Sequence, residues 1–285
     1  MKIKERYQSK KPIISFEVFP PKKEDEFDAA YSTLDELSIL NPDFISVTYG
    51  AGGSRSKKTI EIASYIQNQL QIEALAHITC VGFKSDDLMD IYEDLKRANV
   101  THVLALRGDR PMAMSEEQFM GREFFYAADM ISFLKKNTNL NVAGACYPEK
   151  HYEAVDFKAD LIHLKEKADL GLDFLVSQLF FDNTCFYRFR EASDKLGIHL
   201  PVSAGIMPIT SAKMLGNTVA LSGSSVPKEL SDIIANYGEH PDDMRKAGID
   251  YAIRQCQDLK ENGVDGLHIY TMNKSKTASQ IVNAL

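Results

Sequence analysis

Eight short runs of apolar and β-branched residues alternate along the chain with longer amphipathic segments. The runs have the length of buried strands, and the segments between them repeat apolar residues at helical spacing. The predicted strands are residues 13–19, 44–49, 74–79, 102–107, 141–146, 174–179, 201–205 and 266–271. This alternation is typical of an α/β fold with a parallel sheet. A doubly wound open sheet could also hold it, but the count of eight favours a closed (β/α)8 TIM barrel.

Seven helical patterns lie between these strands, at residues 26–40, 57–69, 85–98, 124–136, 157–170, 184–196 and 242–261. Ser56 and Ser85 are candidate N-caps. Gly171, Gly197 and Gly263 stand where helices should end with a positive φ. These positions are predicted to serve the fold alone.

A chain of 285 residues is long enough for one barrel. No Pro-, Gly- or Ser-rich linker divides it, so we expect a single domain over residues 1–285. The interval 207–264 is longer than one helix and predicts two or three helices between the seventh and eighth strands. Additional helices at this place can add contacts to a substrate.

The net charge of −7 argues against nucleic acid or an anionic membrane surface as a partner. The Lys-rich opening, residues 2–11, is predicted to be a frayed terminus. It lacks the apolar core of a signal peptide, and no later segment offers the ~20 apolar residues of a membrane span. We therefore expect a cytoplasmic protein without a membrane anchor.

The four cysteines, Cys80, Cys146, Cys185 and Cys256, are widely spaced and form no C-x-x-C pair. We expect them to be reduced and partly buried. The seven histidines also lack the spacing of a metal-binding motif. No protein metal site is predicted.

Chemically capable side chains recur where the predicted strands end. In a (β/α)8 barrel these ends meet at one mouth, which is where such folds build their active sites. The residues at or just after strand ends are Glu17, Thr48, His77, Arg107, Asp109, Tyr147, Gln178 and Tyr270. Their positions indicate an enzyme.

Glu17 lies between Phe16 and Val18 in a strongly apolar strand. Desolvation favours the protonated form of a carboxyl group, so Glu17 is a candidate general acid. The alternative is a glutamate on a solvated face or in a buried ion pair.

Other motifs have equally plausible structural interpretations when each is taken alone. Arg107-Gly108-Asp109 could bind a ligand or form an ion pair that orders its own loop. The loop 50–54, Gly-Ala-Gly-Gly-Ser, could admit an anion or a flat ring, or could simply be a tight turn. His77 could be a hydrogen-bonded core histidine. Asp160, His163 and Lys167 share one helix face by their spacing, and a solvated face is the default interpretation.

Taken together, seven ordered motifs resemble methylenetetrahydrofolate reductase from residue 13 to the end of the chain. They are SFEVFPPK with Glu17, VTYGAGGS with Thr48, AHITC with His77, LRGDRP with Asp109, YPEKH with Tyr147, SQLFFD with Gln178, and HIYTMNK with Tyr270 and Lys274. The family's fold is a (β/α)8 barrel that carries FAD. This agrees with the count of eight strands.

The resemblance implies reduction of 5,10-methylenetetrahydrofolate to 5-methyltetrahydrofolate by a ping-pong route through tightly bound, non-covalent FAD. NADH or NADPH is the electron donor, and the choice stays open because the family binds it without a Rossmann fingerprint. Glu17 corresponds to the acid that helps to open the methylene bridge. Asp109 corresponds to the carboxylate near the flavin and the pterin.

By the same resemblance, twelve residues are assigned to FAD: Tyr49, Ala51, His77, Arg107, Gly108, Asp109, Ala127, Tyr147, His151, Asp160, His163 and Lys167. This assignment replaces the solvated-face interpretation of the helix that carries Asp160. Thr48 and Gln178 are implied to contact the nicotinamide, and Gln178 also the folate. Tyr270 is a further substrate contact, and Lys274 lies near the folate tail.

Some positions depart from the family pattern. Lys274 stands where many bacterial members have Arg. Lysine keeps the positive charge but cannot make the bidentate contact that arginine makes with a carboxylate. Segment 210–225 matches poorly, and Thr218 or no clear residue replaces a Phe that stacks on ligands in some members. The chain also stops soon after the eighth strand, without the domain that binds S-adenosylmethionine in larger members, so we expect no inhibition by that compound.

Two alternatives stay open at this point. The divergent segment 210–225 motivates a flavoprotein subunit that receives electrons from a redox partner protein. A flavin-free barrel lyase or folate-binding module would not need the helix face of Asp160 and Lys167. In the reductase interpretation the partners are methylenetetrahydrofolate and NAD(P)H, the protein is expected to be a homo-oligomer, and its product supplies methionine synthesis in one-carbon metabolism.

Overall fold

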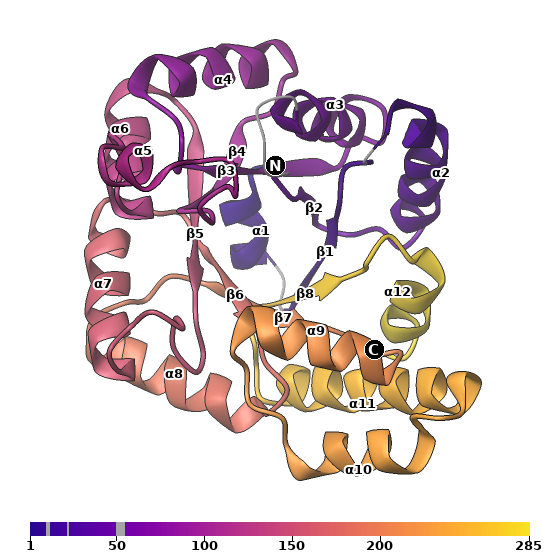
Figure 1. The fold of residues 1–285 in the computed structure, drawn as a ribbon. Coiled ribbons are helices and arrows are strands. Elements are labelled where there is room, and N and C mark those ends of the chain that lie inside the picture. Colours follow the sequence, from indigo (N-terminus) through magenta and orange to yellow (C-terminus); the bar gives the residue numbers. More distant parts are fainter. Residues whose placement is uncertain (10–11, 22, 50–54) are drawn as a thin grey trace.

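All eight predicted strands are present in the computed structural model, which describes residues 1–9, 12–21, 23–49 and 55–285. They are β1 (Ile13–Val18), β2 (Phe44–Val47), β3 (Glu73–Thr79), β4 (His102–Leu106), β5 (Asn141–Cys146), β6 (Leu175–Leu179), β7 (Val202–Ile206) and β8 (Gly266–Tyr270). Each strand pairs in parallel with the next, and β8 pairs with β1, so the sheet closes into a barrel (Figure 1). The predicted single-domain (β/α)8 fold is confirmed.

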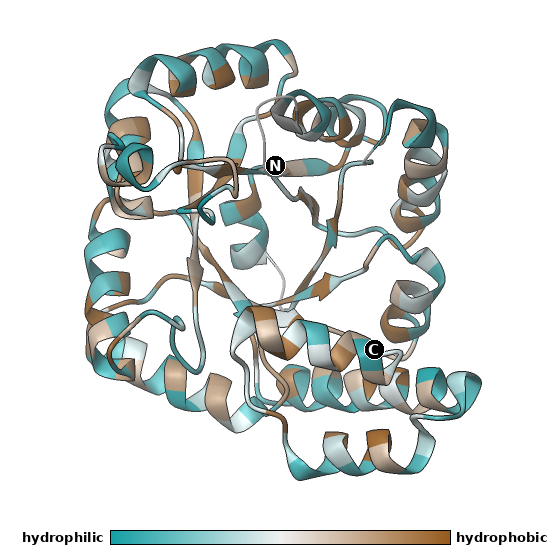
Figure 2. Ribbon diagram, viewed as in Figure 1, coloured by the Kyte–Doolittle hydropathy of each residue, from teal (hydrophilic) through white to brown (hydrophobic). Residues whose placement is uncertain are grey.

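Helices surround the barrel and turn apolar faces towards it (Figure 2). They are α2 (Phe27–Ser38), α3 (Arg55–Asn68), α4 (Ser85–Arg97), α5 (Glu116–Met120), α6 (Ala127–Asn137), α7 (Phe157–Asp169), α8 (Asn183–Lys195), α9 (Ala212–Ser222), α10 (Lys228–Tyr237), α11 (Pro241–Glu261) and α12 (Ser275–Val282), with a 3-10 turn η1 (Glu24–Glu26) before α2. Three of them, α9 to α11, lie between β7 and β8. The predicted additional helices are therefore confirmed.

The predicted helix ends are confirmed and the predicted helix starts are wrong. Gly171, Gly197 and Gly263 have φ of +90°, +72° and +74°. Ser56, by contrast, lies within α3, and Lys84 precedes α4 as its N-cap. Ser85 instead hydrogen-bonds to Glu123 across the surface, a partner 38 residues away that local sequence cannot reveal.

The Lys-rich opening is not frayed, because residues Ile3–Ser9 form a helix, α1, that closes the amino-terminal end of the barrel. Ile3 and Tyr7 are buried one helical turn apart. The backbone N–H of Ile3 donates to Nε2 of His102 (3.3 Å), and the Tyr7 hydroxyl lies 2.7 Å from Oγ of Ser203. The two apolar residues among the lysines therefore decide the conformation of this segment.

The interior of the barrel is apolar at this closed end. Side chains of Ile13, Phe44, Leu75, Leu104 and Phe174 pack there against α1. One layer nearer the carboxyl ends, β1, β2 and β8 place polar side chains in register, with Ser15 opposite His268 and Glu17 opposite Ser46 and Tyr270. The polar layer leads from the core into the mouth of the barrel.

Two further features bear on the predictions. The four cysteines are free: Cys80, Cys146 and Cys256 are buried and Cys185 is partly buried. Among the described residues, no helix is both long and apolar enough to cross a membrane.

Candidate active site

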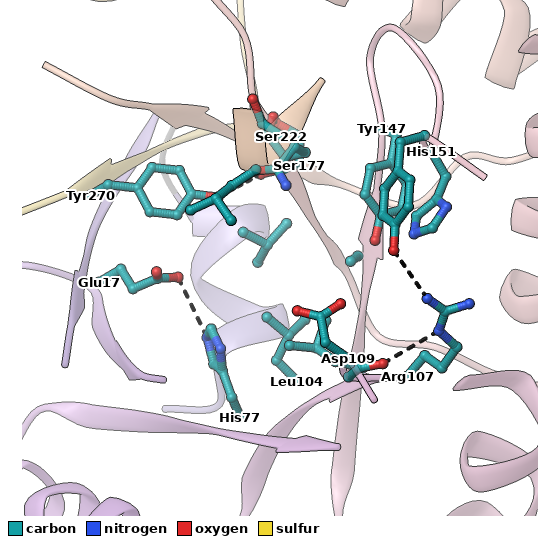
Figure 3. Close-up of a pocket in the computed structure, with 17 residues that line it drawn as sticks. Glu17, His77, Leu104, Arg107, Asp109, Tyr147, His151, Ser177, Ser222 and Tyr270 are labelled. Atoms are coloured by element: carbon teal, nitrogen blue, oxygen red, sulfur yellow. Dashed lines mark hydrogen bonds and ion pairs between the residues drawn. The ribbon is translucent and has the colours of Figure 1, made fainter. Parts of the chain in front are cut away.

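A cavity of about 320 Å³ opens at the carboxyl ends of the strands (Figure 3). Nine residues predicted from the sequence line it: Glu17, His77, Arg107, Gly108, Asp109, Tyr147, His151, Gln178 and Tyr270. They come from β1, β3, β6 and β8 and from the segments that follow β4 and β5. The barrel thus gathers residues that are up to about 250 positions apart in the sequence.

Eight lining residues were not predicted: Leu104, Leu106, Ala145, Tyr152, Val176, Ser177, Leu221 and Ser222. Four of them are apolar side chains of β4, β5 and β6 that line the interior below the polar rim. Strict alternation from Gln178 back along β6 could have found Val176, whereas Leu104 lies an odd number of positions before Asp109 and could not be found in this way. Leu221 and Ser222 belong to α9 and could not be found, because no local signal links that helix to the mouth.

Glu17 is 6% exposed and faces two imidazole rings. Its Oε2 lies 3.6 Å from Nε2 of His77 and 3.5 Å from Nε2 of His268. Figure 3 shows Glu17 and His77 pointing towards each other at one side of the cavity. Glu17 therefore lies inside the barrel beside two histidines, and not on a solvated face.

His77 is buried in the cavity wall, and this burial lowers its pKa to about 4. The ring is neutral near pH 7 for that reason. Within the described ranges, its Nε2 has no hydrogen-bond partner, since 3.6 Å to Glu17 is too long for one. A buried polar atom of this kind at a cavity wall is available to a ligand.

Arg107 and Asp109 do not form the ion pair that the sequence left open. The Arg107 guanidinium binds Glu153, with Nη2 to Oε1 at 3.0 Å, and this contact raises the pKa of Arg107 further. Asp109 is exposed in the cavity, and no ion pair is found for it in the part of the chain that the structure describes. Its carboxylate is thus available at the mouth.

Gly108 makes the turn that separates these two side chains. Its φ is +81°, and a Cβ at this position would lie 2.8 Å from Cβ of Thr79. The close approach of this loop to β3 requires glycine.

The cavity of a TIM barrel fits many chemistries, so comparison with known proteins decides the family. A family model described as methylenetetrahydrofolate reductase matches residues 2–285. The chain belongs to the methylenetetrahydrofolate reductase family. It is therefore an oxidoreductase of that family.

Curated members of the reductase family align over most of the chain. The 5,10-methylenetetrahydrofolate reductase of Pectobacterium carotovorum subsp. carotovorum is 34% identical over 95% of this chain and 89% of its own length. The enzyme of Escherichia coli strain K12 is 30% identical over 95% and 90%. Methylenetetrahydrofolate reductase (NADH) 1 of Arabidopsis thaliana is 31% identical over 99% of this chain, which spans about half (49%) of the plant protein.

Solved structures add support for the fold alone. An uncharacterised Clostridium thermocellum protein, described as binding two copies of 5-methyl-5,6,7,8-tetrahydrofolic acid, aligns with a TM-score of 0.61 at 13% identity, over 99% of this chain and 98% of its own. Dihydropteroate synthase from Xanthomonas albilineans aligns with a TM-score of 0.52 at 13% identity, over 95% and 91%.

The three residues on the helix face predicted from the reductase family to bind FAD differ in their surroundings. Lys167 donates from Nζ to the carbonyl of Ala145 (2.8 Å), and Asp160 accepts the N–H of His151 (3.2 Å). Burial lowers the pKa of Lys167 and raises that of Asp160. Both residues therefore contact residues of the cavity lining, Ala145 and His151. His163 is 69% exposed beside Glu166 and is not part of the lining.

The remaining predicted site residues lie outside the cavity lining. The N–H of Thr48 donates to the carbonyl of Val18 (3.0 Å), and the Tyr49 ring packs edge-on against Phe83. Ala127 begins α6, and Lys274 is exposed at the N-cap of α12. Ala51 and the rest of loop 50–54 lie outside the described residues. In the divergent segment 210–225, Thr218 does not line the cavity, although Leu221 and Ser222 do.

Proposed function

We propose that the protein reduces 5,10-methylenetetrahydrofolate to 5-methyltetrahydrofolate, with NADH or NADPH as donor and FAD as the resident electron carrier. The half-reactions alternate at one cavity in a ping-pong order. The observation that carries this proposal is the buried Glu17 carboxyl at one side of the cavity, in a chain that matches the reductase family over residues 2–285.

In this proposal Glu17 is the general acid. A proton from its carboxyl group reaches the amine nitrogen of the methylene bridge as the carbon–nitrogen bond breaks, and the methylene carbon is left as an iminium on the other nitrogen. The iminium then accepts a hydride and becomes the methyl group. General acids of this kind contribute about 10²- to 10⁴-fold to rate.

The cavity suits a flat cofactor ring. Leu104, Leu106 and Val176 contribute apolar surface to its lining, and Tyr147 and Tyr270 contribute aromatic rings. Bound FAD would supply a two-electron carrier that accepts a hydride from one substrate and delivers it to the next. The unpaired Nε2 of His77 is an available contact for such a ring.

Charged groups extend from the cavity along the loop after β5. We propose that Arg107, His151, Asp160 and Lys167 hold the polar part of FAD, with Gly108, Tyr49 and Ala127 as neighbouring contacts. Asp109, exposed in the cavity, would orient the pterin beside the ring. Ala51 and His163 complete the set implied by the family resemblance.

Gln178 is the proposed contact shared by both substrates. Its side-chain oxygen accepts the N–H of Leu179 (2.9 Å), which leaves the two amide N–H groups for a ligand in the cavity. Thr48 would contact the nicotinamide, Tyr270 the substrate ring, and Lys274 the folate tail. The protein would act in the cytoplasm as a homo-oligomer that supplies methyl groups for methionine synthesis.

The test is an anaerobic turnover assay with purified, FAD-supplemented protein. We expect continued oxidation of NADH or NADPH, beyond the one equivalent that reduces the bound flavin, only when methylenetetrahydrofolate is present, with one 5-methyltetrahydrofolate formed per nicotinamide oxidised in this continued phase. Formation of the product with chemically reduced flavin, but with neither nicotinamide, would instead assign a protein electron donor. Absence of product in both assays would contradict the proposal.

A further inference from the structure

The pairing of β6 with β7 contains one extra residue near the carboxyl end of β6. The pairing is regular up to Val176. Beyond it, Leu179 and not Gln178 lies opposite Gly205. Ser177 and Gln178 therefore share the place of one residue, which is the arrangement of a β-bulge. Bulges re-aim side chains next to active sites, and both residues of this bulge line the cavity.

The hydroxyl of Ser177 closes this bulge through hydrogen bonds on both sides. Its Oγ accepts the backbone N–H of Gly205 (2.9 Å) and donates to the carbonyl of Gln178 (2.9 Å). The direction of both bonds is fixed, because an N–H can only donate and a carbonyl can only accept. Ser177 is 1% exposed, and its single hydroxyl proton is already donated to Gln178. Any effect of this hydroxyl on a substrate therefore passes through its neighbours.

Tyr270 of β8 fixes the same bulge from the other side of β7. Its hydroxyl donates to the carbonyl of Ser177 (3.1 Å), and Figure 3 shows its ring pointing towards Ser177. The ring crosses β7 at Gly205, where a Cβ would lie 2.9 Å from Cε2 of Tyr270 and 2.5 Å from the Ser177 carbonyl oxygen. Only glycine leaves room for this crossing. Both polar groups of Ser177, its hydroxyl and its carbonyl, are thus held by neighbouring strands.

The bulge also determines what Gln178 offers to a ligand. The side-chain Oε1 of Gln178 accepts the backbone N–H of Leu179 (2.9 Å), and only the oxygen of the amide can do so. The amide nitrogen is therefore left with its two N–H groups at the cavity. Because this side chain bonds to the peptide group that follows its own residue, its direction depends on the backbone of the bulge.

We propose that Ser177 is a positioning residue that fixes the bulge in β6 and thereby directs the amide N–H groups of Gln178 at the substrates. The inference rests on the proposed function, in which Gln178 is the contact shared by both substrates. It assigns to Ser177 a role in binding and not in the chemical steps, since no proton or hydride passes through its hydroxyl.

The kinetic test is the concentration dependence of both half-reactions in Ser177→Ala, followed by anaerobic stopped-flow spectroscopy. We expect the half-saturating concentrations of the nicotinamide and of methylenetetrahydrofolate to rise by a few-fold to about tenfold, the effect of one lost hydrogen bond to a ligand. Rates at saturation should change less than about twofold. Ser203→Ala is the matched control and should change neither quantity, because Ser203 is a similarly buried barrel serine that bonds Tyr7 at the closed end.

A double variant separates positioning from general damage to the barrel. If Ser177 acts through Gln178, adding Ser177→Ala to Gln178→Ala should raise neither half-saturating concentration by more than about twofold. Independent effects would multiply instead, and multiplication would overturn the inference. Unchanged half-saturating concentrations in Ser177→Ala alone would also overturn it. Ser177→Cys is the second variant in case Ser177→Ala does not fold. Its thiol is a weak acceptor, so the same pattern is expected with a smaller factor.

Amide hydrogen exchange gives a second readout that needs no activity. The N–H groups of Gly205 and Leu179 should both exchange faster in Ser177→Ala, by a few-fold to about tenfold, because both depend on the fixed bulge. The N–H of Val202, which bonds Asp265 at the closed end (3.0 Å), is the reference and should not change. Faster exchange at Gly205 alone would overturn the inference. If both amides respond but the wild-type protein forms no 5-methyltetrahydrofolate, the proposed function fails and the role of Ser177 in the bulge stands.

Discussion

Glu17 carries a carboxyl group into the interior of the barrel, where an isolated charge is unfavourable. Its neighbours are imidazoles, and one of them, His77, is kept neutral near pH 7 by burial. His77 therefore gives the carboxyl group a polar neighbour at the cavity wall without adding a positive charge there.

Glu17→Gln should separate the two half-reactions. The amide keeps the size of the side chain but cannot donate an acidic proton, so we expect folate reduction to fall by about 10²- to 10⁴-fold. Flavin reduction by the nicotinamide should remain within about twofold. Stopped-flow measurement of each half-reaction checks this, and equal losses in both would make Glu17 a structural residue.

Gln178→Ala should impair both half-reactions, because in the proposed function both substrates accept hydrogen bonds from the same amide group. The loss of a hydrogen bond to a ligand costs about 0.5–1.5 kcal/mol, which corresponds to a few-fold to about tenfold weaker binding of each substrate. The dependence of each half-reaction rate on substrate concentration measures it. An effect confined to one substrate would reject the shared site.

Gly108→Ala should destabilise the protein by about 1–3 kcal/mol, since it forces a positive φ on alanine and a Cβ into Thr79. Gly216→Ala is the matched control: Gly216 lies within α9, and a Cβ there would contact nothing within 4 Å. That change should stabilise by up to about 1 kcal/mol. Urea unfolding measures both, and similar values for the two would contradict the account of the turn.

For single residues, the sequence predicts local setting and backbone conformation better than it predicts which other residues a side chain contacts. The apolar flanks of Glu17 and the turn at Gly108 could be read directly. The pairing of Arg107 with Glu153, 46 residues away, could not.

An aspartate recurs just before the start of three strands at the closed end of the barrel. Asp43 and Asp265 directly precede β2 and β8, and Asp173 lies two residues before the start of β6. Each accepts a backbone N–H from the start of the preceding strand, that of Ile14 (2.8 Å), Val142 (3.0 Å) and Val202 (3.0 Å). The repeat is visible in the sequence as N-P-D-F, G-L-D-F and G-V-D-G, but its bonding partners follow only from the register of the closed sheet.

The helix α1 shows why the start of the chain was mispredicted. Lysines at positions 2, 4, 10 and 11 indicate an exposed terminus, whereas the burial of Ile3 and Tyr7 depends on the open floor of a barrel that only the complete fold provides. A helix of seven residues has little stability alone. Packing against the barrel supplies the stability that helix propensity alone does not give this segment.

Docking of α1 should make stability depend on pH through His102. Burial lowers the pKa of His102 to about 4, against the partly offsetting attraction of Asp173, while the unfolded value is near 6.5. The native state thus binds fewer protons between these values. Its stability is fully present above pH 6.5 and declines as pH falls towards 4, by at most about 1.4 kcal/mol per pH unit for one histidine.

Urea unfolding between pH 7 and pH 5 measures this slope. His77, with the same lowered pKa, adds to it in the wild type. His102→Gln should flatten the slope, because the neutral amide can still accept the N–H of Ile3 without titrating. His199→Gln, at a side chain that is 74% exposed, should leave the slope unchanged. Identical slopes in all three proteins would contradict the account.

For the whole molecule, the fold could be predicted because eight buried strands allow few arrangements, and the mouth of a parallel barrel fixes where an active site forms. The site was predicted where its residues end strands. It was missed where lining residues come from a helix that no local sequence signal links to the cavity, as with Leu221 and Ser222 of α9. That helix comes from the segment least similar to the family, and closure of the barrel places it at the cavity.

In the proposed function, one cavity serves an alternating redox cycle through FAD. The most direct test is the visible spectrum of the purified, FAD-supplemented protein under anaerobic conditions, recorded after NADH or NADPH and again after methylenetetrahydrofolate. We expect a flavin band that bleaches with the nicotinamide and returns with the folate. A flavin band that neither nicotinamide bleaches, or no bound flavin even with excess FAD, would contradict it.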